Sequence, residues 1–182
     1  MKLEDSHYNH WHRRGVSKDI LDTLGVEYSG NWFCIPIMDF QGKILYYKMK
    51  KIWNDEKHKK QPRFMYSHKG VGAMLWPLPY LHKEVKKVYL CEGESDVMAM
   101  MSQGTEAVTS TSGAKTFLPE WVDLFPADIE VVCCYDNDEA GEAGRMKVAE
   151  LFKRRKDITF THIRIPDECP GKDMTEYLLW RR

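Results

Sequence analysis

Three acidic residues in the second half of the chain each come soon after a short apolar stretch: Glu92, Asp136 and Asp173. Asp138 lies two residues beyond Asp136, so both carboxylates can point the same way from an extended strand end. Carboxylates forced together repel one another unless a cation compensates them, and oxygen ligands of this kind suit Mg²⁺ or Mn²⁺ better than zinc. The spacing therefore predicts a divalent-metal site that acts on phosphate groups.

Each acidic motif has a simpler alternative when it is taken alone. The run Glu92-Gly93-Glu94 is typical of a turn, and the run Asp136-Asn137-Asp138 is typical of a helix N-cap or an Asx turn. The order of the motifs, each after a predicted strand, favours the metal site over these alternatives.

The apolar stretches predict strands, and the segments between them predict helices. Continuous apolar runs are typical of strands buried on both faces, and alternation of strand and helix favours a parallel sheet covered by helices. Ligands of such sheets bind beyond the carboxyl ends of the strands, where these acids are expected to converge. The predicted strands are 88–91, 107–109, 129–135 and 158–165, and the predicted helices are the segment after Glu94, 118–124, 139–155 and the segment after Asp173.

The first half of the chain reads as a small basic region. Residues 1–15 read as a polar, mobile lead-in, and Ser17 as the N-cap of a short helix through Leu24. Two strands joined by a hairpin and then a polar loop are expected at 32–37, 43–49 and 53–69. Residues 43–69 carry a net charge of +7, and residues 92–142 a net charge of −11. A basic surface attracts phosphates and an acidic one needs cations, so the two regions are predicted to have different tasks.

Composition and cysteine spacing exclude several classes of protein. No apolar run approaches the roughly 18 residues of a membrane span, and the N-terminal segment lacks the apolar core of a secretory signal. No two cysteines are spaced C-x-x-C, which argues against a zinc finger, and Cys91, Cys133 and Cys134 are expected to be buried thiols. We therefore expect a cytoplasmic protein with no membrane partner, located in the host cytoplasm if it is phage-encoded.

The acidic motifs resemble those of the TOPRIM family, which is shared by bacterial-type primases, topoisomerases and some nucleases. The family pattern is a Glu after one strand and Asp-x-Asp after a later one, and it is matched here by Glu92 and by Asp136 with Asp138. The segments 89–96, 136–141 and 166–178 resemble the primase form of the family. By this resemblance the catalytic residues would be Glu92, Asp136 and Asp138, and two Mg²⁺ or Mn²⁺ ions would be held by Glu92, Asp96, Asp136, Asp138 and Asp173.

The resemblance extends more weakly into the first half, which is similar to the N-terminal lobe of a primase RNA-polymerase domain. It implies an α/β fold in which a TOPRIM domain (85–182), with a central, mostly parallel sheet flanked by helices, follows a small mixed α+β lobe (1–84). The segment 109–114 resembles the Gly-containing loop of phage primase–helicases. The implied nucleotide or nucleic-acid contacts are Lys48, Lys50, Lys69, Ser112, Gly113 and Lys115.

The function implied by the resemblance is that of a DNA primase-like nucleotidyltransferase, which makes short RNA primers from NTPs on a single-stranded DNA template. A TOPRIM nuclease that cleaves DNA or RNA with the same acids, and a non-catalytic nucleic-acid-binding module, are the alternatives. The sequence contains neither a zinc-binding cysteine pair nor a Gly-x-x-x-x-Gly-Lys-Ser/Thr motor motif. The further partners expected in a primosome are therefore a replicative helicase or a separate zinc-binding subunit that recognises the template.

Overall fold

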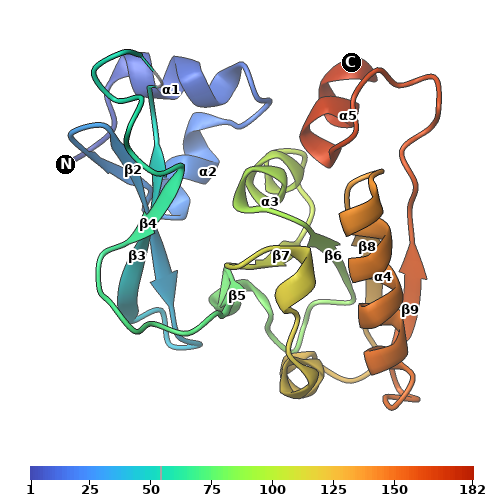
Figure 1. The fold of residues 1–182 in the computed structure, drawn as a ribbon. Helices are drawn as coiled ribbons and strands as arrows, with labels where there is room; N and C mark the ends of the chain where they lie inside the picture. Colours follow the sequence, from blue (N-terminus) through green and yellow to red (C-terminus); the bar gives the residue numbers. More distant parts are fainter. Residues whose placement is uncertain (54) are drawn as a thin grey trace.

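Two β-sheets form the framework of the molecule, the first within residues 27–66 and the second within residues 75–162 (Figure 1). The computed structural model describes residues 1–53 and 55–182, so one residue of the loop predicted at 53–69 lies outside the described residues. The first sheet has the strand order β1-β2-β3-β4, and the second has the order β5-β7-β6-β8-β9. The first half of the chain contributes α1 (Asp5–His12), α2 (Lys18–Thr23), β1 (Glu27–Ser29), β2 (Trp32–Met38), β3 (Ile44–Lys51) and β4 (Phe64–Tyr66).

The central elements of this N-terminal lobe follow the sequence prediction. The hydroxyl of Ser17 accepts a hydrogen bond from the backbone N–H of Ile20 at 3.3 Å, which caps α2 as expected. Strands β2 and β3 pair antiparallel as the predicted hairpin. They form the centre of the lobe, with β1 and β4 at the edges of the sheet.

Two predictions for the lobe were wrong. Residues 1–15 are not a mobile lead-in, because they contain α1, which fixes Trp11 in the core with none of its surface exposed. The predicted loop 53–69 contains β4, which pairs antiparallel with β3. Helix α1 is mostly polar in sequence, with only His7 and Trp11 buried, and β4 is only three residues long (Phe64–Tyr66), so neither shows an apolar period.

The second sheet is mostly parallel, as predicted. Strand β6 pairs in parallel with β7 and β8, β8 pairs in parallel with β9, and β5 joins the edge antiparallel to β7. Since β5 precedes residue 85, the expected division of the chain at 84/85 does not coincide with the edge of this sheet, and it stays a prediction. The elements are β5 (Leu75–Trp76), η1 (Leu78–Tyr80), β6 (Lys87–Cys91), α3 (Glu94–Met101), β7 (Ala107–Ser110), η2 (Ala114–Thr116), η3 (Pro119–Leu124), β8 (Glu130–Cys134), α4 (Glu139–Phe152), β9 (Thr159–His162) and α5 (Met174–Trp180).

The two faces of the second sheet pack into different cores. On one face, Leu90 packs with Val148 and Phe152 of α4 and with the η3 segment. On the other face, Cys91 packs with Met98 of α3, and this core continues into β2 and α1 of the lobe. Because the lobe and the second sheet share a core, their relative position is set by packing rather than by a flexible linker.

The cysteines are buried, as the sequence predicted for Cys91, Cys133 and Cys134. All five cysteines are buried free thiols. Over residues 1–53 and 55–182, the structure contains no helix that is long and apolar enough to cross a membrane.

A candidate metal and phosphate site between the lobes

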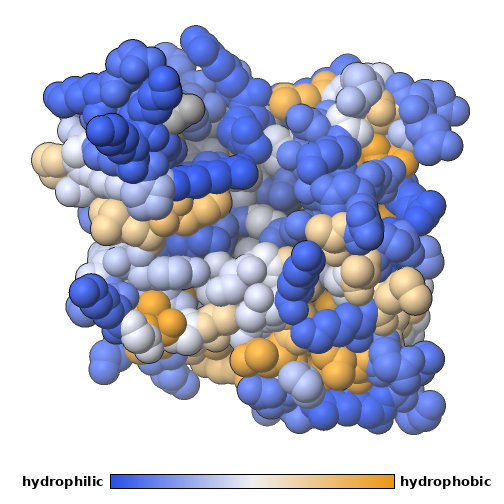
Figure 2. Space-filling model, viewed as in Figure 1, coloured by the Kyte–Doolittle hydropathy of each residue, from blue (hydrophilic) through white to orange (hydrophobic). Residues whose placement is uncertain are grey.

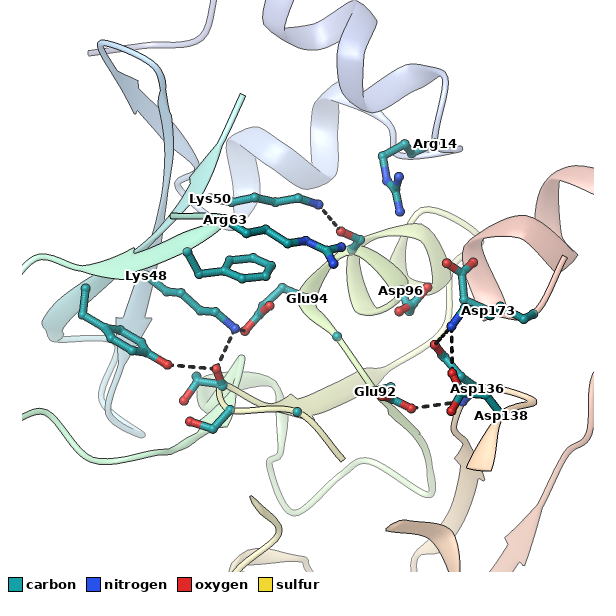
Figure 3. A pocket seen from close by; sticks show the side chains of 18 residues that line it. Arg14, Lys48, Lys50, Arg63, Glu92, Glu94, Asp96, Asp136, Asp138 and Asp173 are labelled. Atoms are coloured by element: carbon teal, nitrogen blue, oxygen red, sulfur yellow. Dashed lines mark hydrogen bonds and ion pairs between the residues drawn. The ribbon is translucent and has the colours of Figure 1, made fainter. Parts of the chain in front are cut away.

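A cavity of about 580 Å³ lies between the N-terminal lobe and the carboxyl edge of the second sheet. Figure 2 shows that this face of the molecule is largely hydrophilic and is hollowed between its two halves. Basic side chains enter from the lobe and acidic ones from the other side (Figure 3). The basic residues are Arg14, Lys48, Lys50 and Arg63, and the acidic residues are Glu92, Glu94, Asp96, Asp136, Asp138 and Asp173.

Strands β6 and β8 bring the first two predicted acids together. Cys91 and Cys134 lie opposite each other in the parallel register, so the chain leaves both strands at the same edge. The backbone N–H of Asp136 donates a hydrogen bond to Oε2 of Glu92 at 3.3 Å. The convergence expected from the strand ends is therefore realised for Glu92 and Asp136.

Asp138 combines the N-cap role that its motif suggested with a place at the same edge. Its Oδ1 accepts a hydrogen bond from the backbone N–H of Gly141 at 3.0 Å, at the start of α4. Its Oδ2 accepts one from Nζ of Lys172 at 2.7 Å. A Cβ at position 141 would lie 2.2 Å from the carbonyl oxygen of Asp136, so glycine is required for this tight turn.

The Asp173 segment is fixed to the same turn by Asn137, whose role the sequence prediction missed. The backbone N–H of Asn137 donates to the carbonyl oxygen of Lys172 at 2.9 Å, and its amide donates to the carbonyl oxygen of Ile165 at 2.7 Å. Asp173 caps α5 by accepting a hydrogen bond from the backbone N–H of Glu176 at 2.7 Å. The only sequence signal for Asn137 is its place between the two aspartates.

Asp96 has a structural partner in this arrangement. It is buried, and its Oδ1 accepts hydrogen bonds from the backbone N–H and the hydroxyl of Thr175 at 3.0 and 2.5 Å. These bonds attach α3 to the first turn of α5, next to Asp173. Asp96 therefore holds the Asp173 segment in place at the floor of the cavity.

Burial, together with mutual repulsion, raises the pKa values of three of the gathered acids, Glu92, Asp96 and Asp136. Burial, with the nearby charges of Glu92, Asp96 and Asp173, raises the pKa of Asp136 to about 7. Burial is also the main cause of the raised pKa of Glu92. In contrast, hydrogen bonds from Lys172 and from the backbone N–H of Gly141 lower the pKa of Asp138. Negative charge at this edge is thus incompletely compensated by the protein itself.

The donor set fits a hard divalent cation. Glu92, Asp136, Asp138 and Asp173 offer only oxygen atoms, and the raised pKa of Asp136 reflects a site that a cation would relieve. Over the described part of the chain, no three or more His, Cys, Asp or Glu side chains are grouped so that they could hold a metal ion by themselves. Mg²⁺ keeps several waters and uses one or two carboxylates together with substrate phosphates, so an open set of acids is compatible with it.

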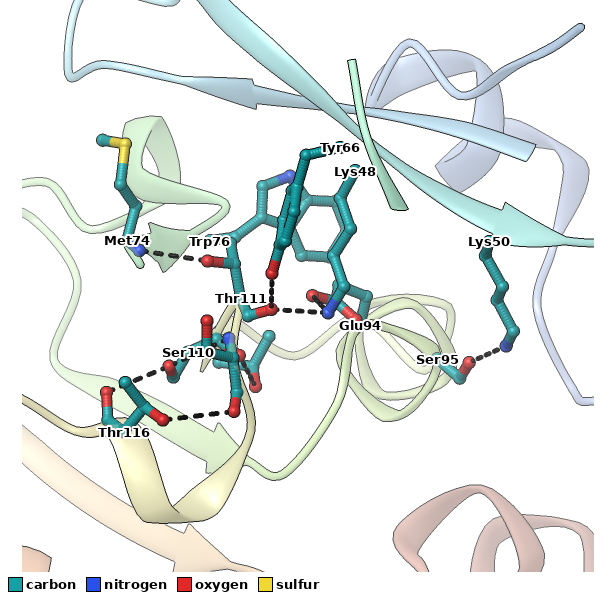
Figure 4. A network of polar contacts seen from close by, with 12 residues as sticks. Lys48, Lys50, Tyr66, Met74, Trp76, Glu94, Ser95, Ser110, Thr111 and Thr116 are labelled. Atoms are coloured by element: carbon teal, nitrogen blue, oxygen red, sulfur yellow. Dashed lines mark hydrogen bonds and ion pairs between the residues drawn. The ribbon is translucent and has the colours of Figure 1, made fainter. Parts of the chain in front are cut away.

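The basic wall of the cavity contains one lysine that is buried, Lys48, and one that is largely covered, Lys50. Lys48 is 7% exposed and donates hydrogen bonds to Oε1 of Glu94 and to the carbonyl oxygen of Thr111, both at 2.6 Å (Figure 4). Lys50 donates to the hydroxyl of Ser95 at 2.6 Å. Burial, followed by the charge of Arg14, lowers the pKa of Lys50 to about 8.

The remaining predicted contacts separate into two groups. Ser112 and Gly113 line the cavity, whereas Lys69 and Lys115 are exposed and are not among its lining residues.

Two arginines that the sequence analysis did not predict for the site, Arg14 and Arg63, line the cavity from the lobe. Their signals in the sequence were the Arg14-Gly15 pair and the position of Arg63 within the basic run.

Residues 89–178 match the family described as Toprim-like. This segment contains the parallel strands and the acidic edge described above, and we call it the Toprim-like domain. The relatives and solved structures that this chain is similar to are bacterial and phage primases. The DNA primase of Escherichia coli (strain K12) is 28% identical over 117 residues, which cover 63% of this chain and 20% of the E. coli protein. The DNA primase of Haemophilus influenzae is 28% identical over 123 residues, which cover 66% of this chain and 21% of that protein. The chain thus spans about a fifth of the length of these relatives.

Solved primase structures share the fold of nearly the whole chain. The Aquifex aeolicus primase (zinc-binding and RNA polymerase domains) has a TM-score of 0.77 at 17% identity, covering 97% of this chain and 53% of that chain. The DnaG primase catalytic domain bound to ssDNA has a TM-score of 0.73 at 18% identity, covering 98% and 68%. The primase fragment of the bacteriophage T7 primase-helicase has a TM-score of 0.67 at 20% identity, covering 99% and 74%. At these identities the likeness is one of fold, and it includes the N-terminal lobe.

Proposed function

We propose that this protein is a primase-type nucleotidyltransferase that synthesises short RNA primers on single-stranded DNA. The observation that carries the proposal is the cavity itself, in which acids from three segments of the Toprim-like domain face basic side chains of the lobe. The DNA primases among its relatives support the same activity. The proposed boundary between lobe and Toprim-like domain lies at residues 84/85.

In this proposal the acids hold the metal and the lobe holds the polyanions. Asp136 and Asp138 are the main ligands, Glu92 is either a ligand or the general base, and Asp173 completes the set. Two Mg²⁺ or Mn²⁺ ions bound there would supply a more acidic 3′-hydroxyl and charge compensation at the triphosphate. Arg14 and Arg63 attract the phosphates of template and NTP, since basic side chains lower the cost of bringing two polyanions together.

The proposed partners follow from the same relatives. The T7 protein is a primase-helicase, and the Aquifex primase was solved with a zinc-binding domain. We propose that this chain works with a replicative helicase or with a zinc-binding unit that recognises the template. The proposed nucleotide or nucleic-acid contacts also include Lys50, Lys69, Ser112, Gly113 and Lys115. Asp96 and Lys48 remain in the proposed site and act through the contacts described above.

The test is primer synthesis on an end-labelled single-stranded DNA template with four NTPs and Mg²⁺ or Mn²⁺. The protein is expected to make short RNA products, and Asp136→Asn is expected to abolish them while the far-ultraviolet circular dichroism stays unchanged. Glu120→Gln is the matched control, because Glu120 is an exposed acid outside the cavity. Shortening of the template without RNA synthesis would replace the proposal with a nuclease. DNA binding without either product would replace it with a non-catalytic binding module.

A further inference from the structure

The ammonium group of Lys172 occupies the space beside two of the proposed metal ligands. Its Nζ lies 2.7 Å from Oδ2 of Asp138 and 4.0 Å from Oδ2 of Asp136. In the described part of the chain, these ion pairs are the ones that join a basic side chain to the Asp136/Asp138 pair. The other lysines of the cavity, Lys48 and Lys50, contact Glu94 and Ser95 instead.

The backbone around Lys172 is fixed on both sides, so its placement is a property of the fold. Its carbonyl oxygen accepts a hydrogen bond from the backbone N–H of Asn137 at 2.9 Å, and its own N–H donates to Oε2 of Glu176 at 2.8 Å. A Cβ at Gly171 would come within 2.2 Å of the Glu176 side chain, so the chain can approach α5 this closely only with glycine there. The side chain itself is 62% exposed and is free to turn away.

A divalent ion and this ammonium group cannot both occupy the space between the two carboxylates. Mg²⁺ binds carboxylate oxygens at about 2.0–2.1 Å and carries its own shell of waters. An ammonium group 2.7 Å from the same Asp138 oxygen would repel that ion and compete for the oxygen. Since the side chain is exposed, it can leave with little loss of packing.

We propose that Lys172 is an internal competitor for the divalent cation, and this inference rests on the metal site of the proposed function. With no ion bound, the Lys172 ammonium compensates the charge of Asp136 and Asp138 and keeps these repelling acids together. Binding of an ion displaces the ammonium from the pair. Lys172 therefore sets how much free Mg²⁺ or Mn²⁺ the protein needs before the site fills.

The test is calorimetric titration of the nucleotide-free protein with Mn²⁺, comparing the wild type with Lys172→Met and Lys172→Arg. Removal of one positive charge a few ångströms from a partly solvated divalent ion is expected to lower the dissociation constant about tenfold in Lys172→Met. Lys172→Arg keeps the charge and is expected to bind no more tightly than the wild type. Lys153→Met is the matched control, since Lys153 pairs with Glu150 at 2.5 Å on an exposed face of α4 and is expected to leave Mn²⁺ binding unchanged.

The outcomes separate this inference from the proposed function. Wild-type binding that is lost in Asp136→Asn but is unchanged or weakened in Lys172→Met would overturn the role of Lys172 and leave the metal site standing. No Mn²⁺ binding by either the wild type or Lys172→Met would overturn both. Mn²⁺ binding by Lys172→Met under conditions in which the wild type binds none would support the inference most directly. Lys172→Gln repeats the test with a polar neutral side chain if the Met variant folds poorly.

Discussion

Nζ of Lys48 lies 2.6 Å from Oε1 of Glu94, and this buried ion pair joins β3 of the lobe to α3 of the Toprim-like domain (Figure 4). The same ammonium donates to the carbonyl oxygen of Thr111, which also accepts a hydrogen bond from the hydroxyl of Tyr66. The basic strand of the lobe is thus tied directly to the acidic edge. The width of the cavity depends on this contact, because it crosses the boundary between the two walls.

Lys48→Met is expected to destabilise the protein strongly. It leaves the Glu94 carboxylate buried without its partner, and breaking a buried pair in this way costs about 3–5 kcal/mol. Chemical denaturation measures the change in the free energy of unfolding. The double variant Lys48→Met/Glu94→Gln is expected to recover part of the loss, since the unpaired charge is removed.

The control for this prediction is Lys153→Met, which breaks an exposed pair with Glu150. Exposed pairs contribute about 1 kcal/mol or less. If Lys48→Met is no more destabilising than Lys153→Met, Lys48 does not act as a connection between the lobes, and a direct contact with phosphate becomes its better explanation.

Gly141→Ala is expected to disturb the turn that carries Asp136 and Asp138. The added Cβ would lie 2.2 Å from the carbonyl oxygen of Asp136, a backbone atom that cannot move without shifting the acid itself. Forced overpacking of this kind costs about 1–3 kcal/mol. We expect a lower midpoint of thermal unfolding and weaker Mn²⁺ binding in the variant.

Gly72→Ala provides the comparison, because a Cβ at Gly72 meets nothing within 4 Å. Its unfolding free energy is expected to change by about 0.5 kcal/mol or less, as at ordinary surface positions. Equal behaviour of the two variants would show that the turn at Asp136 is not held as tightly as its contacts indicate.

Thr175→Val tests whether Asp96 anchors α5. The substitution keeps the shape of the side chain but removes the hydroxyl that donates to Asp96 at 2.5 Å. A hydrogen bond to a charged, buried acceptor contributes about 1.5–3 kcal/mol, so the free energy of unfolding is expected to fall by that amount. Thr159→Val, at an exposed position of β9, is expected to be close to neutral. Unchanged stability in Thr175→Val would instead favour Asp96 as a metal ligand alone.

The acidic edge of the sheet could be predicted from the sequence because two simple rules act there. Buried parallel strands read as continuous apolar runs, and the residues that follow them meet at one edge, as Glu92 and Asp136 do. The contacts of Lys48 could not be predicted, since its partner Glu94 is 46 residues away and no local pattern links them. Helix α1 was not predicted, because its sequence is mostly polar and the tertiary packing of Trp11 fixes it in the core.

The roles of Asp96 and Lys172 also depend on tertiary contacts. A family resemblance identified Asp96 as an acid of the site, but its bonds to Thr175 appear only when α3 and α5 pack together. Lys172 precedes Asp173 in the sequence, and nothing local indicates that its ammonium reaches Asp138. Sequence patterns thus identified which residues gather, while the division of their tasks required the fold.

The lowered pKa of Lys50 predicts how binding of single-stranded DNA depends on pH. Burial and the neighbouring charge of Arg14 lower the pKa of Lys50 from 10.5 to about 8, so the lobe loses this positive charge as the pH rises through 8. Between pH 8 and 10.5 the unfolded chain binds more protons than the folded one, so this group makes the free energy of unfolding rise with pH. Over the same range the loss of the Lys50 charge weakens DNA binding.

Fluorescence anisotropy of a labelled oligonucleotide at constant ionic strength, from pH 7 to 9, is expected to show the weaker binding. Lys50→Arg stays charged over the whole range and is expected to bind independently of pH, whereas Lys50→Met is expected to bind weakly throughout. A wild type whose affinity stays constant from pH 7 to 9 would contradict the assignment of Lys50 to phosphate binding.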